Sequence, residues 1–297
     1  MARGARMDDD IMQAILRLAI PKGRITEEVV RLLAAAGVRV RSDGRSYRPV
    51  LSDPEIEAKY LKPQNIPRLI EIGAHDCGFT GHDWIVESGA DVIDCLDTGL
   101  DPVTLVAAAH EDRAGDIDRL PRPIVVASEF ETITRKYMEG RGRPWLFIRT
   151  HGATEVFPPE DADLILDLRA SGLTLRENRL VVLDEVLQST TRFVGSRTAL
   201  ADPAKAEKIE SIRTLMAAVL EARRRVLLEM NVPSDRLQAV VAVLPSMKSP
   251  TIQELYGGTG YAVKAAVPRD GLSRTIQALR QAGATDLLAY ALEKVIP

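Results

Sequence analysis

Residues 15–24 read ILRLAIPKGR, an apolar run that ends in a turn. The run has the length and the flanks of a β-strand. Residues 25–36 then place their apolar side chains at helical spacing, and Gly37 suits the position just past the end of a helix. An extended segment follows at residues 38–40. The order strand, short loop, helix, strand predicts an α/β protein.

The same alternation continues to about residue 200. Apolar runs predict strands at 76–81, 104–109, 124–127, 145–149 and 162–168, and helical spacing predicts helices at 66–72, 84–88 and 132–140. Short apolar strands that alternate with helices favour mostly parallel sheets with right-handed crossovers. Because this stretch is long for one sheet, we expect two lobes.

The composition changes at Asp202-Pro203, where an N-cap residue precedes a proline at the first helical position. Helical spacing predicts that this helix continues to about Met230, and Pro233 ends the segment. A separate small unit follows, with strands expected at 237–244, 261–267 and 287–291 and a helix at 272–282. By analogy of fold, such a unit is typical of appended ligand-sensing modules.

The charge balance argues against nucleic acid as a partner. The 297 residues contain 39 Lys and Arg against 42 Asp and Glu, for a formal net charge of −3. No excess of cations is available to cover an extended row of phosphates. Aromatic residues make up only 4%, which argues against a stacking surface for single strands.

The sequence also argues against membrane association and predicts a cytoplasmic protein. No apolar run approaches the roughly eighteen residues that a membrane span needs. Residues 1–14 lack the apolar segment of a signal peptide, and we interpret them as a flexible leader. Cys77 and Cys95 are too few for a disulfide framework, so we expect free thiols in a reducing compartment. The expected partners are small molecules or copies of the same chain.

The sharpest chemical feature is the segment DLRASGLTL at residues 167–175, directly after a buried strand. A loop at the carboxyl end of a strand suits a phosphate monoester when it contains glycine and hydroxyl side chains, because backbone N–H groups can approach closely. The hydroxyls of Ser171 and Thr174 would bind phosphate oxygens, and Asp167 would accept hydrogen bonds from ribose hydroxyls. The alternative is an ordinary strand–helix connection in which the two hydroxyls cap the helix.

Six further segments accompany this loop: LAIPKGR at 18–24, RSYRP at 45–49, KPQNIP at 62–67, DCGFTGHD at 76–83, TRKY at 134–137 and LPSMKSPT at 244–251. Together they resemble the ATP phosphoribosyltransferase family, in the long form that carries a C-terminal regulatory domain. The resemblance runs from about Leu16 to the last residues. The sequence departs from the family pattern at Asn65, where Asp is usual, at Arg169, where an apolar residue is usual, and at 157–159, where Phe-Pro-Pro replaces an expected Gly.

The resemblance implies a two-lobed catalytic part with a central cleft, similar to periplasmic binding proteins, and a C-terminal ferredoxin-like α+β regulatory domain. Lobe I would hold residues 15–107 together with 190–220, lobe II would hold 108–189 with the loop, and the regulatory domain would hold 221–297. The implied reaction transfers the 5-phosphoribosyl group from 5-phosphoribosyl 1-diphosphate (PRPP) to N1 of ATP and releases diphosphate. It is the first step of histidine biosynthesis.

Such a transfer needs no covalent nucleophile, which agrees with the absence of a Ser/His/Asp or Cys/His signature. Catalysis would come from holding two polyanions in line and from neutralising the leaving group, with Mg²⁺ chelated by the diphosphate. The resemblance implies PRPP contacts at Asp167, Ala170, Ser171, Gly172, Leu173, Thr174 and Leu175, and ATP or diphosphate contacts at Lys22, Gly23, Arg24, Arg48, Lys62 and Glu155. The alternative for each of the charged residues in the second set is an ordinary surface charge. His82 and His151 fall in expected cleft loops, but their spacing indicates no metal site.

The resemblance also implies that L-histidine binds the C-terminal unit as a feedback inhibitor, near Asn231, Ser249 and Thr251, and that the protein is a homo-oligomer, a dimer or a hexamer. The alternative for these residues is a capped loop in a small sandwich. Two other functions stay open: a two-lobed small-molecule binding protein and a non-catalytic regulatory paralogue. The first would carry a signal peptide and no phosphate loop, and the second would be expected to lose Lys22, Asp167 or Thr174.

Overall fold

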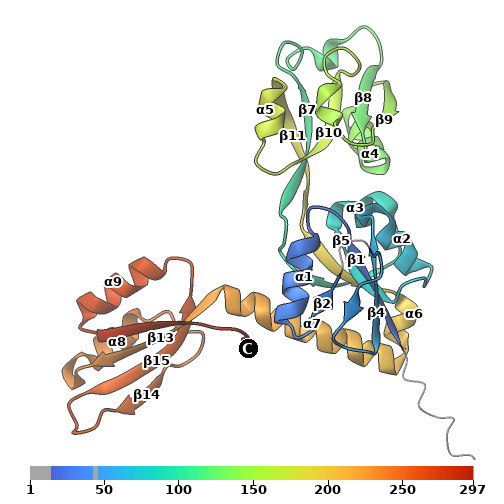
Figure 1. The fold of residues 1–297 in the computed structure, drawn as a ribbon. Helices are drawn as coiled ribbons and strands as arrows, with labels where there is room; N and C mark the ends of the chain where they lie inside the picture. Colours follow the sequence, from blue (N-terminus) through green and yellow to red (C-terminus); the bar gives the residue numbers. More distant parts are fainter. Residues whose placement is uncertain (1–14, 43–45, 297) are drawn as a thin grey trace, which may run out of the picture. The chain divides into compact units, whose positions relative to one another are not determined.

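The computed structural model describes residues 15–42 and 46–296, so the interpretation of residues 1–14 as a leader lies outside the described residues. The chain divides into two units. Unit 1 holds the described residues up to Ala34 and Val38–Arg213, and unit 2 holds Ala35–Gly37 and the described residues from Thr214. Unit 1 contains two five-stranded sheets and unit 2 contains one four-stranded sheet (Figure 1).

The first sheet of unit 1 forms lobe I. Its strands, in spatial order, are β4 (Ile56–Leu61), β1 (Leu16–Pro21), β5 (Cys77–Gly81), β12 (Thr191–Gly195) and β6 (Ile93–Asp97). Strand β1 is parallel to β4 and β5, whereas β12 is antiparallel to β5 and β6. The other elements of this lobe are α1 (Thr26–Ala35), the hairpin β2 (Val40–Arg41) and β3 (Val50–Leu51), the 3₁₀ turn η1 (Pro63–Asn65), α2 (Ile66–Glu71), α3 (His82–Ser88) and α6 (Arg197–Ala201).

The second sheet of unit 1 forms lobe II. Its order is β11 (Leu180–Ser189), β7 (Val103–His110), β10 (Leu164–Arg169), β8 (Ile124–Ser128) and β9 (Trp145–Arg149). Strand β8 is parallel to β9 and β10, and β7 is antiparallel to β10 and β11. The other elements are η2 (Ile117–Arg119), α4 (Glu131–Arg141), η3 (Thr154–Val156) and α5 (Leu173–Glu177). The whole of β7 pairs within this sheet, so residues 103–107 lie with lobe II and not with lobe I.

The expectation of mostly parallel sheets is wrong, because both sheets are mixed. The sequence pattern does not predict the antiparallel strands β11 and β12, which carry the chain from lobe II back to lobe I. Two register shifts in β11, between Val182 and Asp184 and between Glu185 and Leu187, interrupt the alternation of buried and exposed side chains. A strand with such irregularities loses its period-two pattern and escapes detection.

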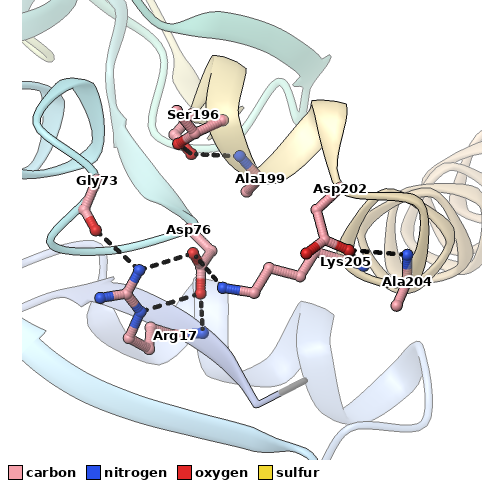
Figure 2. Close-up of polar contacts among 9 residues, drawn as sticks. Arg17, Gly73, Asp76, Ser196, Ala199, Asp202, Ala204 and Lys205 are labelled. Atoms are coloured by element: carbon pink, nitrogen blue, oxygen red, sulfur yellow. Dashed lines mark hydrogen bonds and ion pairs between the residues drawn. The ribbon is translucent and has the colours of Figure 1, made fainter. Parts of the chain in front are cut away.

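The helix α7 (Pro203–Arg223) begins as the sequence predicts, and its first turn is fixed to lobe I. Asp202 Oδ1 accepts hydrogen bonds from the backbone N of Ala204 at 3.0 Å and of Lys205 at 3.2 Å. Lys205 Nζ lies 2.9 Å from Asp76 Oδ1, and the guanidinium of Arg17 binds both oxygens of the same carboxylate (Figure 2). Burial alone would raise the pKa of Asp76, but the hydrogen bonds from Arg17 and Lys205 hold it below its ordinary value. Asp76 therefore ties α7 to the starts of β1 and β5.

Two elements near this helix differ from the sequence prediction. Helix α7 ends at Arg223 instead of about Met230, and β13 (Arg225–Val232) follows. In β13 every second side chain is buried, a period-two pattern that the helical interpretation overlooked. The strand expected at 237–244 is instead helix α8 (Leu237–Val243), after the 3₁₀ turn η4 (Ser234–Arg236). A short run rich in valine favours a strand locally, and packing of the buried Val240 against the unit 2 core overrides that preference.

Unit 2 has the order β13, α8, β14 (Thr251–Glu254), β15 (Tyr261–Pro268), α9 (Leu272–Ala282) and β16 (Thr285–Ala291). Its antiparallel sheet has the strand order β14-β15-β13-β16 (Figure 1). This βαββαβ order is the ferredoxin-like arrangement. The predicted fold class is thus confirmed: a two-lobed α/β part and a ferredoxin-like unit. The division between the units falls within α7, after Arg213, whereas the sequence placed it after residue 220.

Two expectations about the chain as a whole can be compared with the described residues. In this part of the chain no helix is both long and apolar enough to cross a membrane. Cys77 and Cys95 are free thiols, as the sequence predicts, with Cys77 buried and Cys95 half-buried.

Candidate active site in the cleft of unit 1

The turn after β1 lines a cavity of about 140 Å³ in unit 1. Lys22, Gly23 and Arg24 lie on one side of it, next to residues that follow the parallel strand β5. The carboxyl ends of neighbouring parallel strands meet at one sheet edge, where α/β proteins bind their ligands. Leu168 and Ser189 of lobe II also line the cavity, so it lies between the two lobes.

The two cations of this turn already have partners within the chain. Arg24 Nη2 lies 2.8 Å from Asp101 Oδ2, and Lys22 Nζ lies 3.8 Å from the centre of the Tyr47 ring. The Arg24 side chain is more than half exposed, and exposed ion pairs contribute only about 0–1 kcal/mol. A polyanionic ligand can therefore displace Asp101 from Arg24 at little cost.

A buried carboxyl group, that of Asp83, lines this cavity. Asp83 is 3% exposed and accepts a hydrogen bond from the hydroxyl of Ser189, whose Oγ in turn accepts one from the backbone N of Asp83 at 3.1 Å. Burial raises the pKa of Asp83 above its ordinary value, against the lowering effect of the Ser189 hydrogen bond. A Cβ at Gly81 would collide with Asp83 Oδ1, so a larger residue here would force the buried carboxyl group to shift. No pattern in the sequence indicates a role for Asp83 or Ser189, although residues 76–83 carry part of the family resemblance.

A second cavity of about 430 Å³ also lies between the lobes. Lobe I contributes Lys62 with the η1 turn, and lobe II contributes Glu129, Arg149 and His151. Trp84 of α3 lines both cavities. The volume falls within the range of about 300–1,000 Å³ that is usual for small-molecule sites. The structure thus places Lys62 in a different cavity from Lys22 and Arg24, and it adds Arg149 as a cation that the sequence did not single out.

The loop between β10 and α5 has the conformation that its glycine permits. Gly172 has a φ of +73°, in the left-handed region that side chains disfavour. Ser171 Oγ accepts a hydrogen bond from the backbone N of Leu173 at 3.3 Å, but the N-cap position of α5 is Gly172, so neither hydroxyl occupies the cap that the alternative interpretation expects. Leu175 is buried and anchors the loop, while Ala170, Ser171, Leu173 and Thr174 are exposed. The exposed hydroxyls are available to a ligand.

Asp167 lies within β10, two residues before the end of the strand, in an acidic environment. Burial, together with the nearby carboxylates of Glu155 and Glu129, raises the pKa of Asp167 to about 6. Its Oδ1 also accepts a hydrogen bond from the backbone N of Leu168 at 2.8 Å. Glu155 therefore lies near Asp167, so these two candidate site residues are brought together. Arg48 is an exposed residue just before β3 and lines neither cavity.

The described residues contain no group of three or more His, Cys, Asp or Glu side chains that could hold a metal ion. Mg²⁺ binds mainly through phosphate oxygens and water and needs only one or two protein carboxylates. The residues present therefore fit a magnesium ion that arrives on a diphosphate, and they do not form a resident metal cage.

The three effector candidates lie in unit 2. Asn231 of β13 and Gln253 of β14 both pair with Ala262 of β15, and Thr251 pairs with Lys264 two positions further along. Because side chains alternate along a strand, Asn231 and Thr251 lie on the same face of the sheet. Asn231 Nδ2 donates to Asp286 Oδ2 at 3.0 Å. Ser249 is exposed in the segment just before β14.

The fold and the site define a class, the two-lobed α/β proteins with a cation-lined cleft. The chain matches the family model described as ATP phosphoribosyltransferase over residues 62–218 and the model described as HisG, C-terminal domain over residues 222–294. An ATP phosphoribosyltransferase of Desulforudis audaxviator is 38% identical over 287 residues, which are 95% of this chain and 99% of that protein. One of Thermodesulfovibrio yellowstonii is 37% identical over 288 residues, with 95% and 99% covered.

A solved structure supports the same relationship. The ATP phosphoribosyl transferase (HisG:HisZ) complex from Thermotoga maritima contains a chain that is 27% identical and superposes with a TM-score of 0.60. The match covers 68% of this chain and 98% of that chain. The chain described here belongs to the ATP phosphoribosyltransferase family, as the sequence motifs predict, and it matches the long form with a C-terminal domain.

Proposed function

We propose that the cleft of unit 1 transfers the 5-phosphoribosyl group from PRPP to N1 of ATP, with release of diphosphate. The transfer is the reaction of the family to which the chain belongs and the first step of histidine biosynthesis. The observation that carries the proposal for the site is the placement of Lys22 and Arg24 at the carboxyl edge of the lobe I sheet, in a cavity that the end of β10 also lines. Two anionic substrates can then be held by opposite lobes.

In this proposal the loop after β10 holds the 5-phosphate of PRPP. Backbone N–H groups around Gly172 and the exposed hydroxyls of Ser171 and Thr174 are donors for phosphate oxygens. Asp167, two residues before the end of β10, accepts hydrogen bonds from the ribose hydroxyls. The remaining loop residues, Ala170, Leu173 and Leu175, shape the backbone and anchor it.

The cations of lobe I neutralise the diphosphate and the ATP phosphates. Lys22 and Arg24, with Gly23 between them, act on the leaving diphosphate, and Lys62 acts in the larger cavity, whose volume suits part of a nucleotide. Arg48 and Glu155 are secondary candidates for ATP contacts. Bound Mg²⁺ would supply positive charge to the diphosphate oxygens as the ribosyl bond breaks. These cations stabilise the same charge by their position at the edge of the lobe I sheet.

The C-terminal unit is proposed to bind L-histidine as a feedback inhibitor at Asn231, Ser249 and Thr251. Hydroxyl and amide groups of this kind can pair with the carboxylate and ammonium of an amino acid. Inhibition at a distance requires that histidine bind two global states of the protein with different affinity. We place this coupling in a homo-oligomer, a dimer or hexamer, of a cytoplasmic enzyme.

The test is an ultraviolet assay for N1-substituted adenine with the purified chain, ATP, PRPP and Mg²⁺. We expect product from the wild type, no product from Asp167→Ala, and inhibition of the wild type by histidine. Glu139→Ala, an exposed acid on α4, serves as the matched control and should keep full activity. A chain that binds both substrates without turnover would indicate the non-catalytic paralogue.

A further inference from the structure

Helix α4 of lobe II is capped by a side chain of lobe I. Glu87, on α3, accepts hydrogen bonds from the backbone N of Thr132 and of Ile133 at 3.1 Å each, one to each carboxylate oxygen. These N–H groups belong to the first turn of α4, where the helix has no partners of its own for them. Phe130 occupies the N-cap position of α4, and its side chain has no polar atom that could accept these hydrogen bonds. A carboxylate at this end also matches the positive end of the helix dipole.

A ring contact lies beside this cap. Trp84, three residues before Glu87 on the same helix, stacks on Phe130 with ring centres 4.5 Å apart and planes inclined by 29°. Phe130 is 2% exposed and belongs to the core of lobe II. Trp84 lines both cavities, so the position of this contact bears directly on the shape of the cleft.

The other end of α3 is attached to the segment that connects the lobes. Asp83 is hydrogen-bonded to Ser189, the last residue of β11, and β12 of the lobe I sheet begins two residues later. Helix α3 thus contacts lobe II at α4 and the connecting strand at Ser189. This seven-residue helix is therefore hydrogen-bonded at one end to the strand that connects the lobes and at the other end to α4 of lobe II.

We propose that Glu87 is a positioning residue for the transfer reaction: by capping α4 from lobe I, it sets the distance between the two lobes and hence between the two bound substrates. The effect on the rate of transfer rests on the proposed function, whereas the effect on the distance between the lobes does not. Reacting atoms must approach to about 3–3.5 Å, and a displacement of about 1 Å can lower the rate by about 100-fold. A cap that joins the two lobes controls that approach without touching either substrate.

A purely local cap would stabilise α4 and leave the lobe distance unchanged. The two roles can be separated with three variants: Glu87→Ala, which removes both acceptors, Glu87→Gln, which keeps one acceptor oxygen, and Glu139→Ala at the exposed far end of α4. Pulsed electron spin resonance measures the lobe distance between labels on cysteines introduced at the exposed Glu28 of lobe I and Glu160 of lobe II, with Cys95→Ser as background. Circular dichroism and the melting temperature establish that each variant is folded.

We expect Glu87→Ala to broaden and shift the label distance and to lower kcat by at least about tenfold, with Glu87→Gln between it and the wild type and Glu139→Ala unchanged. An unchanged distance in both Glu87 variants overturns the proposal, whatever their activity. A shifted distance with unchanged kcat overturns it as well, because the cap would then not position the reaction. If the wild type itself has no transferase activity, the proposed function fails, and the distance measurement still decides whether Glu87 holds the lobes.

Discussion

Replacement of Gly81 by alanine should destabilise the cleft through one identifiable collision. The backbone of Gly81 has φ −72° and ψ 146°, a conformation that alanine adopts freely, so the backbone itself causes no strain. The added Cβ would lie 2.1 Å from Asp83 Oδ1 and 3.1 Å from its Cγ. Since heavy atoms need about 3.5 Å, the carboxyl group must move by more than 1 Å and leave Ser189.

The expected magnitude follows from these two effects. Loss of the hydrogen-bond partner of a buried carboxyl group lowers the free energy of unfolding by about 1–3 kcal/mol, and overpacking lowers it by about 1–3 kcal/mol more. We therefore expect Gly81→Ala to lower the free energy of unfolding by about 2–6 kcal/mol. Gly140→Ala is the matched control, because its Cβ meets no described atom within 4 Å, and alanine in a helix is favoured by about 0.5–1 kcal/mol.

Urea unfolding measured by circular dichroism provides the free energies, and a double-mutant cycle identifies the cause. In an Asp83→Ala background the colliding carboxyl is absent, so Gly81→Ala should cost less than about 1 kcal/mol there. An equal cost in both backgrounds would refute the collision with Asp83 as the reason for glycine at this position. A neutral Gly81→Ala in the wild-type background would refute it more simply.

Three further predictions concern charge and effector binding. The pKa of Asp167 is raised to about 6 from an ordinary 3.8, so the native state loses stability as the pH rises between these values. Asp167→Asn should accordingly increase the free energy of unfolding at pH 7 by about 3 kcal/mol. The melting temperature should therefore rise at pH 7 and not at pH 4, while kcat/KM falls. For Asp76 the pKa is lowered, so its ion pairs stabilise the native state above the ordinary pKa and are lost as the pH falls through the lowered value. Asp76→Asn should lower the free energy of unfolding at pH 7 by about 2–4 kcal/mol. In urea titrations below pH 3.8, the difference in this free energy between wild type and variant should become smaller. Ser249→Ala combined with Thr251→Ala should abolish inhibition by histidine at unchanged basal kcat, and retained inhibition in the assay would remove these residues from the effector site.

Much of the architecture can be predicted from local patterns. Residues 15–24 predict β1 and its turn because an apolar run ends at Pro21 and Gly23, and the turn then places Lys22 and Arg24 at the sheet edge. The start of α7 is likewise predicted from a local pattern, the N-cap residue Asp202 followed by Pro203. The prediction of an element is wrong where local preference and tertiary packing conflict. The valines of α8 favour a strand locally, and the bulges of β11 remove the alternation of buried and exposed side chains by which a strand is recognised.

The features that join the lobes could not be predicted from one sequence. Asp83 and Ser189 are 106 residues apart, and Glu87 reaches α4 across 45 residues. No periodicity connects such positions, because their contact depends on how two complete sheets are placed. The segment that we propose binds phosphate can be singled out in the sequence because its polar residues are contiguous, from Asp167 to Leu175, whereas the cleft around it depends on the whole of unit 1.

The central claim, that the cleft transfers a phosphoribosyl group to N1 of ATP, is tested most directly by identifying the product. Purified wild-type chain would be mixed with ATP, PRPP and Mg²⁺, and the nucleotides would be resolved by mass spectrometry together with released diphosphate. We predict phosphoribosyl-ATP and diphosphate in equal amounts from the wild type and neither from Asp167→Ala. Diphosphate without phosphoribosyl-ATP, or no product from a wild-type protein that binds both substrates, would contradict the claim.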